Sequence, residues 1–190
     1  MESSSAAAGS GAAAGKEEDG GGDRCGVERW AVKVAADPLA KNIILTPRTT
    51  TVNVLRSLPV PVDAYYRTPP VETTVWTVKA QLVEMKIEAD SDVHLIIADP
   101  ATGSTMIIEF PSDGCTGNTL ATMRPKIRAA RKALLAACGA ATTSGFRRLN
   151  GTATISGVGF FDKIHGQTGV APNGIELHPV LAFSGKCSGA

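Results

Sequence analysis

The sequence predicts a mainly β domain, a small five-stranded barrel that carries one inserted helix. Five runs rich in Val, Ile, Thr and aromatic residues lie between residues 74 and 183, separated by polar turns and loops. Between the third and fourth runs, apolar residues recur every three or four positions, which is the spacing of a helix. Hydrophobic residues make up 43% of the 190-residue chain, enough for a core.

Two segments are expected to precede the barrel. The first is rich in Ala, Gly and Ser, and it has too little apolar surface to fold, so we expect a disordered low-complexity tail. The second is a helical and extended prelude, in which Thr49 to Thr51 cap a short apolar helix that stops at Pro59. The segments are the tail, 1–26, the prelude, 27–72, the barrel, 73–184, and a flexible C-terminus, 185–190.

The first three strands follow one another through short connections. A polar turn joins the first strand to the second, and a hairpin with Gly103 near its end joins the second to the third. The strands are predicted over residues 74–88, 92–98 and 104–110.

A helix and two strands complete the barrel. Thr122 is expected to cap the helix, which places Pro125 in the first turn, and Gly139 ends it. The apolar stripe of the helix is Met123, Ile127, Ala130 and Leu134. The last two strands are predicted over residues 151–162 and 174–183.

This order of elements, three strands, one helix and two strands, is that of an OB-type barrel. In such a barrel the third strand pairs with both the second and the fifth. A mixed α+β sandwich is the main alternative.

Polar side chains are expected to share one outward face of three adjacent strands. Side chains alternate across a strand, so the residues between inward apolar positions point outward. In the last strand the inward set is Ile175, Leu177 and Leu181. Across the three strands the outward set is Asp92, His94, Glu109, Glu176 and His178. Neighbours on paired strands lie only about 5 Å apart, so these side chains are predicted to meet.

Loop residues are expected to rim this wall, because the loops after the first and fourth strands flank the binding surface of OB barrels. The candidate rim residues are Glu88, Asp90, His165 and Asn173. Carboxylates and imidazoles bind divalent metals, and histidine transfers protons near neutral pH. We therefore predict a divalent metal ion held by Asp92, His94, Glu176 and His178, with Glu109 and His165 as catalytic groups.

Composition bears on the binding partners, the state of the cysteines and the cellular location. The net charge of +1 argues against binding driven by general attraction to phosphate. Four cysteines without C-x-x-C spacing exclude the usual cysteine zinc site and predict reduced thiols. No segment approaches the about 20 apolar residues that a membrane helix needs. A cytoplasmic location without membrane contact is therefore expected.

Two resemblances add to this interpretation. The segment Gly157–Val180, with its motif HGQTGVAPNGIELHPV, and the segment Glu88–His94 resemble a group of small uncharacterised bacterial proteins. That likeness covers most of the chain after Val27 and implies no established function.

The second resemblance is more distant. The strand-turn-strand Lys86–Leu95 is similar to the corresponding part of thermonuclease-type (staphylococcal-nuclease-like) OB domains. Those domains carry Asp-Gly-Asp at this turn, and the resemblance implies that Asp92 is a metal ligand. Here Ser91 replaces the glycine, and His94 has no counterpart in that pattern. The arginines that such domains use on phosphate would correspond to Arg147 and Arg148.

Three functions are compatible with these observations. The first is a metal-dependent phosphodiesterase, nuclease-like, acting on nucleic acid or on a small phosphate ester. The second is a non-catalytic OB module that binds nucleic acid, an oligosaccharide or a protein partner. The third is a structural hydrogen-bond network or a subunit interface, since each outward residue taken alone is ordinary for a strand.

Overall fold

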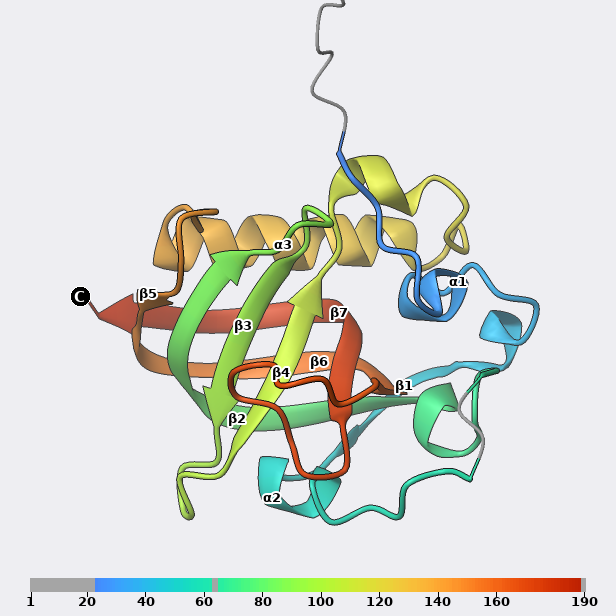
Figure 1. Cartoon of the computed structure of the whole chain (residues 1–190), viewed down its shortest axis with the longest axis horizontal. Coiled ribbons are helices and arrows are strands. Elements are labelled where there is room, and N and C mark those ends of the chain that lie inside the picture. The colour runs from blue at the N-terminus through green and yellow to red at the C-terminus, as the bar shows by residue number, and fades with distance from the viewer. Residues whose placement is uncertain (1–22, 63–64, 189–190) are drawn as a thin grey trace, which may run out of the picture.

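Five strands close into a barrel (Figure 1) in the computed structural model, which describes residues 23–62 and 65–188. These strands are β2 (Thr74–Ile87), β3 (Val93–Ala98), β4 (Thr105–Phe110), β6 (Asn150–Phe161) and β7 (Ile175–Ser188). They pair in the order β2-β3-β4-β7-β6, and β6 pairs with β2 to close the ring. The β4–β7 pair is parallel and the other four pairs of the ring are antiparallel. The predicted mainly β barrel with one inserted helix is confirmed, and it is consistent with an OB-like fold.

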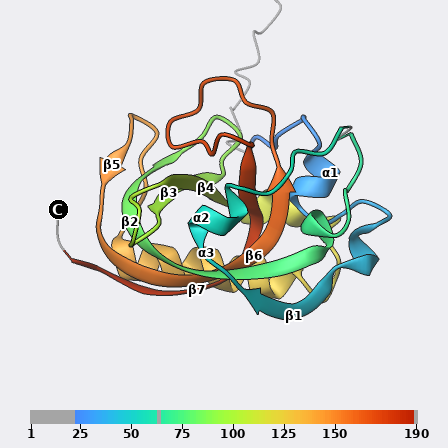
Figure 2. The same ribbon diagram turned by 90° about the horizontal axis from the view of Figure 1, so that it is seen from below.

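Two helices close the ends of the barrel. α3 (Arg124–Cys138) lies across one end, and the single-turn α2 (Val52–Leu55) lies at the other (Figures 1 and 2). Leu134 of α3 and Leu55 of α2 are buried in the same apolar cluster as the inward side chains of the strands. Because side chains fill the interior, a ligand site has to lie on the outer surface of the barrel.

The start of α3 differs from the prediction. The helix begins at Arg124 with Met123 as its N-cap, and no side chain caps it, so Thr122 does not have the predicted role. Pro125 does lie in the first turn, and Gly139 ends the helix with a φ of 77°, a conformation that glycine adopts without strain.

The prelude packs against the barrel as several short elements. Thr51 caps α2 as predicted, since its side chain accepts a hydrogen bond from the Val54 amide at 3.1 Å. The strand β1 (Ile44–Thr49) was not predicted. All six of its residues are exposed, so its sequence lacks the alternation of apolar and polar residues that marks a strand. Further short elements are α1 (Trp30–Lys33), η1 (Ala40–Asn42), β1 (Ile44–Thr49), η2 (Val71–Thr73), η3 (Asp113–Thr116) and β5 (Arg147–Arg148).

An irregularity in β7 changes which of its side chains face the core. Gly157 of β6 pairs with Val180, while Gly159 pairs with Leu177, so three steps along β7 match two along β6. This bulge shifts the inward position to Val180. Leu181, predicted to point into the barrel with Leu177, instead joins a second apolar cluster outside it.

Two disulfides connect segments that are far apart in the sequence. Cys25 is bonded to Cys115, and Cys138 is bonded to Cys187. The prediction of reduced thiols is therefore wrong. The spacings of 90 and 49 residues follow no local motif, so only the fold reveals the pairing. Disulfides persist in oxidising compartments, which weighs against the predicted cytoplasmic location.

Both terminal segments are more ordered than predicted where they can be described. Residues 1–22 of the predicted tail and the last two residues lie outside the described part of the chain. Within it, the Asp23 carboxylate accepts a hydrogen bond from the Gly114 amide at 3.1 Å, and β7 continues to Ser188. No helix among the described residues is long and apolar enough to cross a membrane.

We expect the Cys138–Cys187 disulfide to stabilise the fold, because it joins the end of α3 to the last strand. Replacing both cysteines by serine should lower the free energy of unfolding by about 2–4 kcal/mol in urea denaturation. Reduction of the wild type should lower it at least as much. Free thiols detected in the denatured, unreduced protein would contradict the pairing.

Candidate metal centre

The structure brings the predicted outward residues of three strands together. His94 of β3 lies directly across from Glu109 of β4, and Glu176 of β7 pairs with Ile107 of β4. His178 follows two positions along β7, on the same side of the strand as Glu176. The parallel β4–β7 pairing therefore places His178 beside Glu109, with 3.2 Å between Nδ1 and Oε2.

This wall faces away from the barrel interior, but it is not exposed to solvent as the predicted position on an outer wall implied. Asp92 and His178 are 0% exposed, and Glu176 is 1% exposed. Aromatic rings cover His178 edge-on, with ring centroids 6.5 Å away for Trp30 of α1 and 5.7 Å away for Phe160. The prelude thus folds over the polar wall and turns it into a buried site.

Carboxylate and imidazole side chains alternate in a continuous row across this site. Asp92 Oδ2 lies 3.5 Å from His178 Nε2, and the other ring nitrogen of His178 faces Glu109. Glu109 Oε1 lies 3.2 Å from His94 Nδ1, which is 3.3 Å from Glu88 Oε1. This row of side chains extends from the fully buried Asp92 to Glu88, whose side chain is 31% exposed.

His94 is held by acceptors on both sides of its ring. Nδ1 contacts the Glu109 carboxylate, and Nε2 lies 3.3 Å from the backbone oxygen of Thr168. These two oxygen atoms lie on opposite sides of the ring and so fix its orientation. His94 thereby ties the loop between β6 and β7 to the barrel wall.

His178 is in a different situation. Its two nitrogens lie within ion-pair distance of Asp92 and Glu109, yet the directions do not fit hydrogen bonds. Within residues 23–62 and 65–188, no group forms a hydrogen bond with His178 Nδ1, His178 Nε2, Asp92 Oδ2 or Glu176 Oε2. Buried polar atoms ordinarily have partners, so this cluster of unpaired atoms is a place where a ligand could bind.

The pKa values of two carboxyl groups in the site are shifted in opposite directions. Burial opposes ionisation of Glu109, but the hydrogen bond from His94 and the positive charges of His178 and Lys33 outweigh it and lower its pKa to about 2. Burial and the negative charge of Glu109 raise the pKa of Glu176 well above its usual value. At moderately acidic pH, Glu109 is thus a carboxylate while Glu176 keeps its proton.

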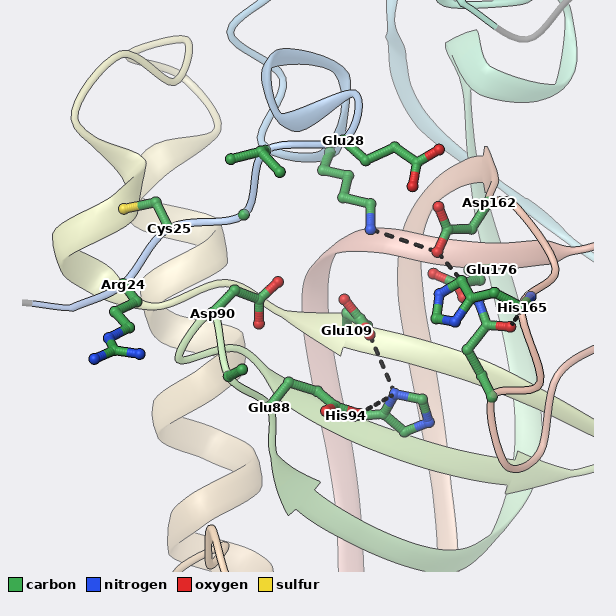
Figure 3. Close-up of a pocket in the computed structure, with 15 residues that line it drawn as sticks. Arg24, Cys25, Glu28, Glu88, Asp90, His94, Glu109, Asp162, His165 and Glu176 are labelled. Carbon is green, nitrogen blue, oxygen red and sulfur yellow. Dashed lines mark hydrogen bonds and ion pairs between the residues drawn. The ribbon is translucent and has the colours of Figure 1, made fainter.

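A cavity of about 450 Å³ opens above this site (Figure 3). Residues of the prelude, the β2–β3 turn and the β6–β7 loop form its walls, and Figure 3 shows Glu109 and Glu176 reaching into it from the barrel. The cavity is strongly acidic. Six carboxyl residues line it, Glu28, Glu88, Asp90, Glu109, Asp162 and Glu176, against the two cationic residues Arg24 and Lys33.

The charges of the cavity influence one another. Burial, followed by the charges of Asp92 and Glu109, raises the pKa of Asp90. Burial opposes the charge of Lys33, but Asp162 and Glu109 outweigh it and raise the pKa of this lysine. Lys33 Nζ lies 3.5 Å from the Asp162 carboxylate. The lining is thus an acidic environment that holds one ammonium group in place.

The four predicted rim residues and the two arginines expected to contact phosphate divide into two groups. Glu88, Asp90 and His165 line the cavity, in agreement with the expectation. The other three do not. The Asn173 side chain donates to the backbone oxygens of Leu55 and Leu58 and so fixes α2. Arg147 donates to the backbone oxygens of Cys138 and Ala140, and Arg148 lies next to it in β5.

Sequence reasoning missed the cavity residues that come from outside the predicted barrel strands. Three of these residues, Arg24, Glu28 and Lys33, belong to segments assigned to the tail and prelude. No sequence pattern in those segments predicts that they pass over the polar face of the barrel. The even number of cysteines was the available signal, because a bond between Cys25 and Cys115 carries the N-terminal segment to the cavity.

Three residues have the geometry for a divalent cation. One ring nitrogen of His178 and one oxygen each of Asp92 and Glu109 lie within 4.8 Å of one another, and all three residues are buried. Mixed imidazole and carboxylate donors suit ions such as Zn²⁺ or Mn²⁺. This set differs from the predicted ligands, because Glu109 occupies the place foreseen for His94 and Glu176. His94 instead orients Glu109.

Comparisons of the chain with protein-family models, with curated proteins and with solved structures found no match. The interpretation of the site therefore depends on its geometry and chemistry.

We expect unequal losses of stability when the two carboxyl residues are replaced in metal-free protein. Glu109→Gln removes the carboxylate that lies between His94 and His178 and should cost about 3–5 kcal/mol at pH 7. Glu176→Gln replaces a carboxyl group whose ionisation is disfavoured by burial and by the charge of Glu109, so it should cost much less. Urea denaturation in the presence of a chelator measures both values.

The contribution of Glu176 to the stability of the fold should decrease as pH rises. Because the pKa of folded Glu176 is raised, its stabilising contribution is complete below the usual value of 4.5 and is lost as pH rises toward the folded pKa. Glu176→Gln should therefore gain stability relative to the wild type between pH 5 and pH 8. A constant difference across this range would contradict the assignment.

The Cys25–Cys115 disulfide should hold the N-terminal wall of the cavity in place. After Cys25→Ser, the amides of residues 24–34 should exchange with deuterium faster than in the wild type, because only noncovalent contacts then retain the segment. Cys138→Ser removes the remote disulfide and is the matched control. Equal protection of residues 24–34 in wild type and Cys25→Ser would disprove this role.

Proposed function

We propose that this protein is a divalent-cation-dependent hydrolase of small phosphate esters, with the cation held by Asp92, Glu109 and His178. The observation that carries the proposal is the group of unpaired buried atoms in Asp92 and His178, which lie beside the Glu109 carboxylate beneath an acidic cavity. An OB-like barrel, whose interior is filled, provides a rigid wall for such a site.

The charge balance of the cavity supports a cation and a small substrate. A phosphate ester is an anion, and six carboxyl residues against Arg24 and Lys33 would repel it. A bound divalent ion would reverse this field locally, polarise the phosphoryl group and favour ionisation of a water molecule. A nucleic acid strand brings many phosphates to the acidic rim, so the lining favours a small ester over a strand.

The residues of the chain then have distinct roles. Lys33 and Arg24 offer positive charge to the non-bridging phosphate oxygens from the N-terminal wall. His165 lies on the cavity wall and is exposed, so it can exchange protons with solvent. In the reaction, the oxygen of water bonds to phosphorus as the bond from phosphorus to the alcohol oxygen breaks. One proton leaves the water, and one is delivered to the departing alcohol.

The proposal predicts hydrolysis that depends entirely on metal. Purified protein should bind Mn²⁺ or Zn²⁺ in calorimetry, and bis(4-nitrophenyl) phosphate should be hydrolysed with the ion and not with chelator. Asp92→Asn should abolish binding and hydrolysis, whereas Glu84→Gln, which removes a carboxylate of β2 outside the cavity, should preserve both. Retention of metal affinity in Asp92→Asn would disprove the assignment of the centre.

A non-catalytic module is the second candidate, and the acidic lining is the observation that favours it. Six carboxyl residues suit a metal ion or an organic cation as the final ligand as well as they suit a catalytic cation. Metal binding that is lost in Asp92→Asn, together with no hydrolysis of phosphate mono- or diesters, would favour this module over the hydrolase.

A further inference from the structure

A second and larger groove of about 1040 Å³ lies beside the acidic cavity. Its walls come from α1, from the segment before η2 and from the β6–β7 loop. Side chains that give it an apolar character include Trp30, Val60, Tyr65, Tyr66 and Ile164. This groove differs from the acidic cavity in chemistry, and the proposed metal centre makes no use of it.

Large apolar side chains are unusually exposed along this groove. Tyr65 is 72% exposed, Tyr66 70%, Val60 60% and Ile164 50%. The two tyrosine rings meet edge to face with centroids 4.9 Å apart, so they form one aromatic surface. Exposed apolar groups that gather in a hollow mark a binding site more often than scattered ones do.

The groove and the acidic cavity adjoin each other. Val27, Glu28 and Asp162 line both, so these residues form the boundary across which one molecule can extend. A ligand with a polar group in the cavity thus has room for an apolar group in the groove.

We propose that the groove binds a planar aromatic group of the substrate ester while the phosphate lies in the acidic cavity. This inference rests on the proposed function and specifies its substrate class, an aryl phosphate ester. Aromatic rings bind planar π-systems by edge and face contacts and gain from burying apolar area. Lys163 also lines the groove.

The N-terminal residues of this chain do not suit the groove as an internal ligand. Residues 1–22 consist mainly of Ala, Gly and Ser with a few charged residues, and Met1 is their one large apolar residue. Nothing in that composition matches the aromatic surface. A second copy of the chain is the other possible occupant, and it is tested below.

The first test measures binding separately from hydrolysis. Chelated, metal-free protein is titrated with uncharged 4-nitrobenzyl alcohol, which the acidic cavity does not repel, while the fluorescence of Trp30 is recorded, because nitrophenyl groups quench tryptophan. Trp30→Phe shows which part of the signal belongs to Trp30 and which to Trp76. We expect saturable quenching, and binding weakened about tenfold in Tyr66→Ala. Tyr66→Phe, which keeps the ring, should bind nearly as well as the wild type.

Ile164→Ala and Ile44→Ala form a matched pair. Both remove an exposed isoleucine side chain, 50% exposed at 164 in the groove and 60% exposed at 44 on β1. The change in the groove should weaken binding and the change on β1 should not. Equal affinities of Tyr66→Ala, Ile164→Ala and wild type for the probe would overturn the proposal, as would the absence of any quenching.

The second test uses the metal-loaded protein. Methyl 4-nitrophenyl phosphate and bis(4-nitrophenyl) phosphate have the same leaving group, and the latter carries a second ring for the groove. We expect a higher kcat/KM for the diaryl ester and loss of that preference in Tyr66→Ala. Hydrolysis of both esters without preference would overturn the groove assignment and leave the hydrolase intact. Probe binding that depends on Tyr66, with no hydrolysis, would support the groove and overturn the proposed function. A dimer that dissociates in Ile164→Ala would assign the groove to a second copy and overturn the proposal.

Discussion

The parallel pairing of β4 with β7 is the constraint on which the site depends. In an antiparallel ring of consecutive strands, residues distant in sequence rarely meet on one face. The β4–β7 pair brings a strand before α3 next to the last strand, with Ile108 opposite Leu177. That register sets Glu109 beside His178 on the outer face, while Ile108 and Leu177 fill the core on the inner face. The same alternation thus builds the core and the polar wall.

Burial makes this wall chemically distinct from an ordinary strand surface. Water would weaken the interaction between two exposed carboxylates. In the covered wall, where water is excluded, electrostatic interactions are stronger. The effect is visible in Glu109 and Glu176, whose pKa values move apart although both are carboxyl groups on neighbouring strands. The cover is the prelude, held by Arg29, whose guanidinium donates to the Phe161 backbone oxygen of β6 at 2.7 Å, and by the Cys25–Cys115 bond just before it.

Local patterns in the sequence sufficed for the barrel strands and for the shared face of the polar residues. Alternation of Val93, Leu95 and Ile97 leaves His94 outward whatever the rest of the chain does. The bulge near Val180 was beyond such reasoning, because it depends on how β6 and β7 fit around the closed ring. Burial of the wall was also unpredictable, since the covering segment around Trp30 has no periodic signal and its position follows from long-range contacts and a disulfide.

The position of the cover has a further consequence for the energetics of the site. Trp30 and Lys33 of α1 close the wall above His178 and Asp162, and Cys25 and Glu28 just before α1 line the cavity. A cation bound beneath them would neutralise carboxylates that otherwise repel one another, so it would favour the closed arrangement. By linkage, whatever stabilises docking of the prelude must also strengthen cation binding. The prelude is therefore part of the site in the thermodynamic sense, although no residue of it belongs to the barrel.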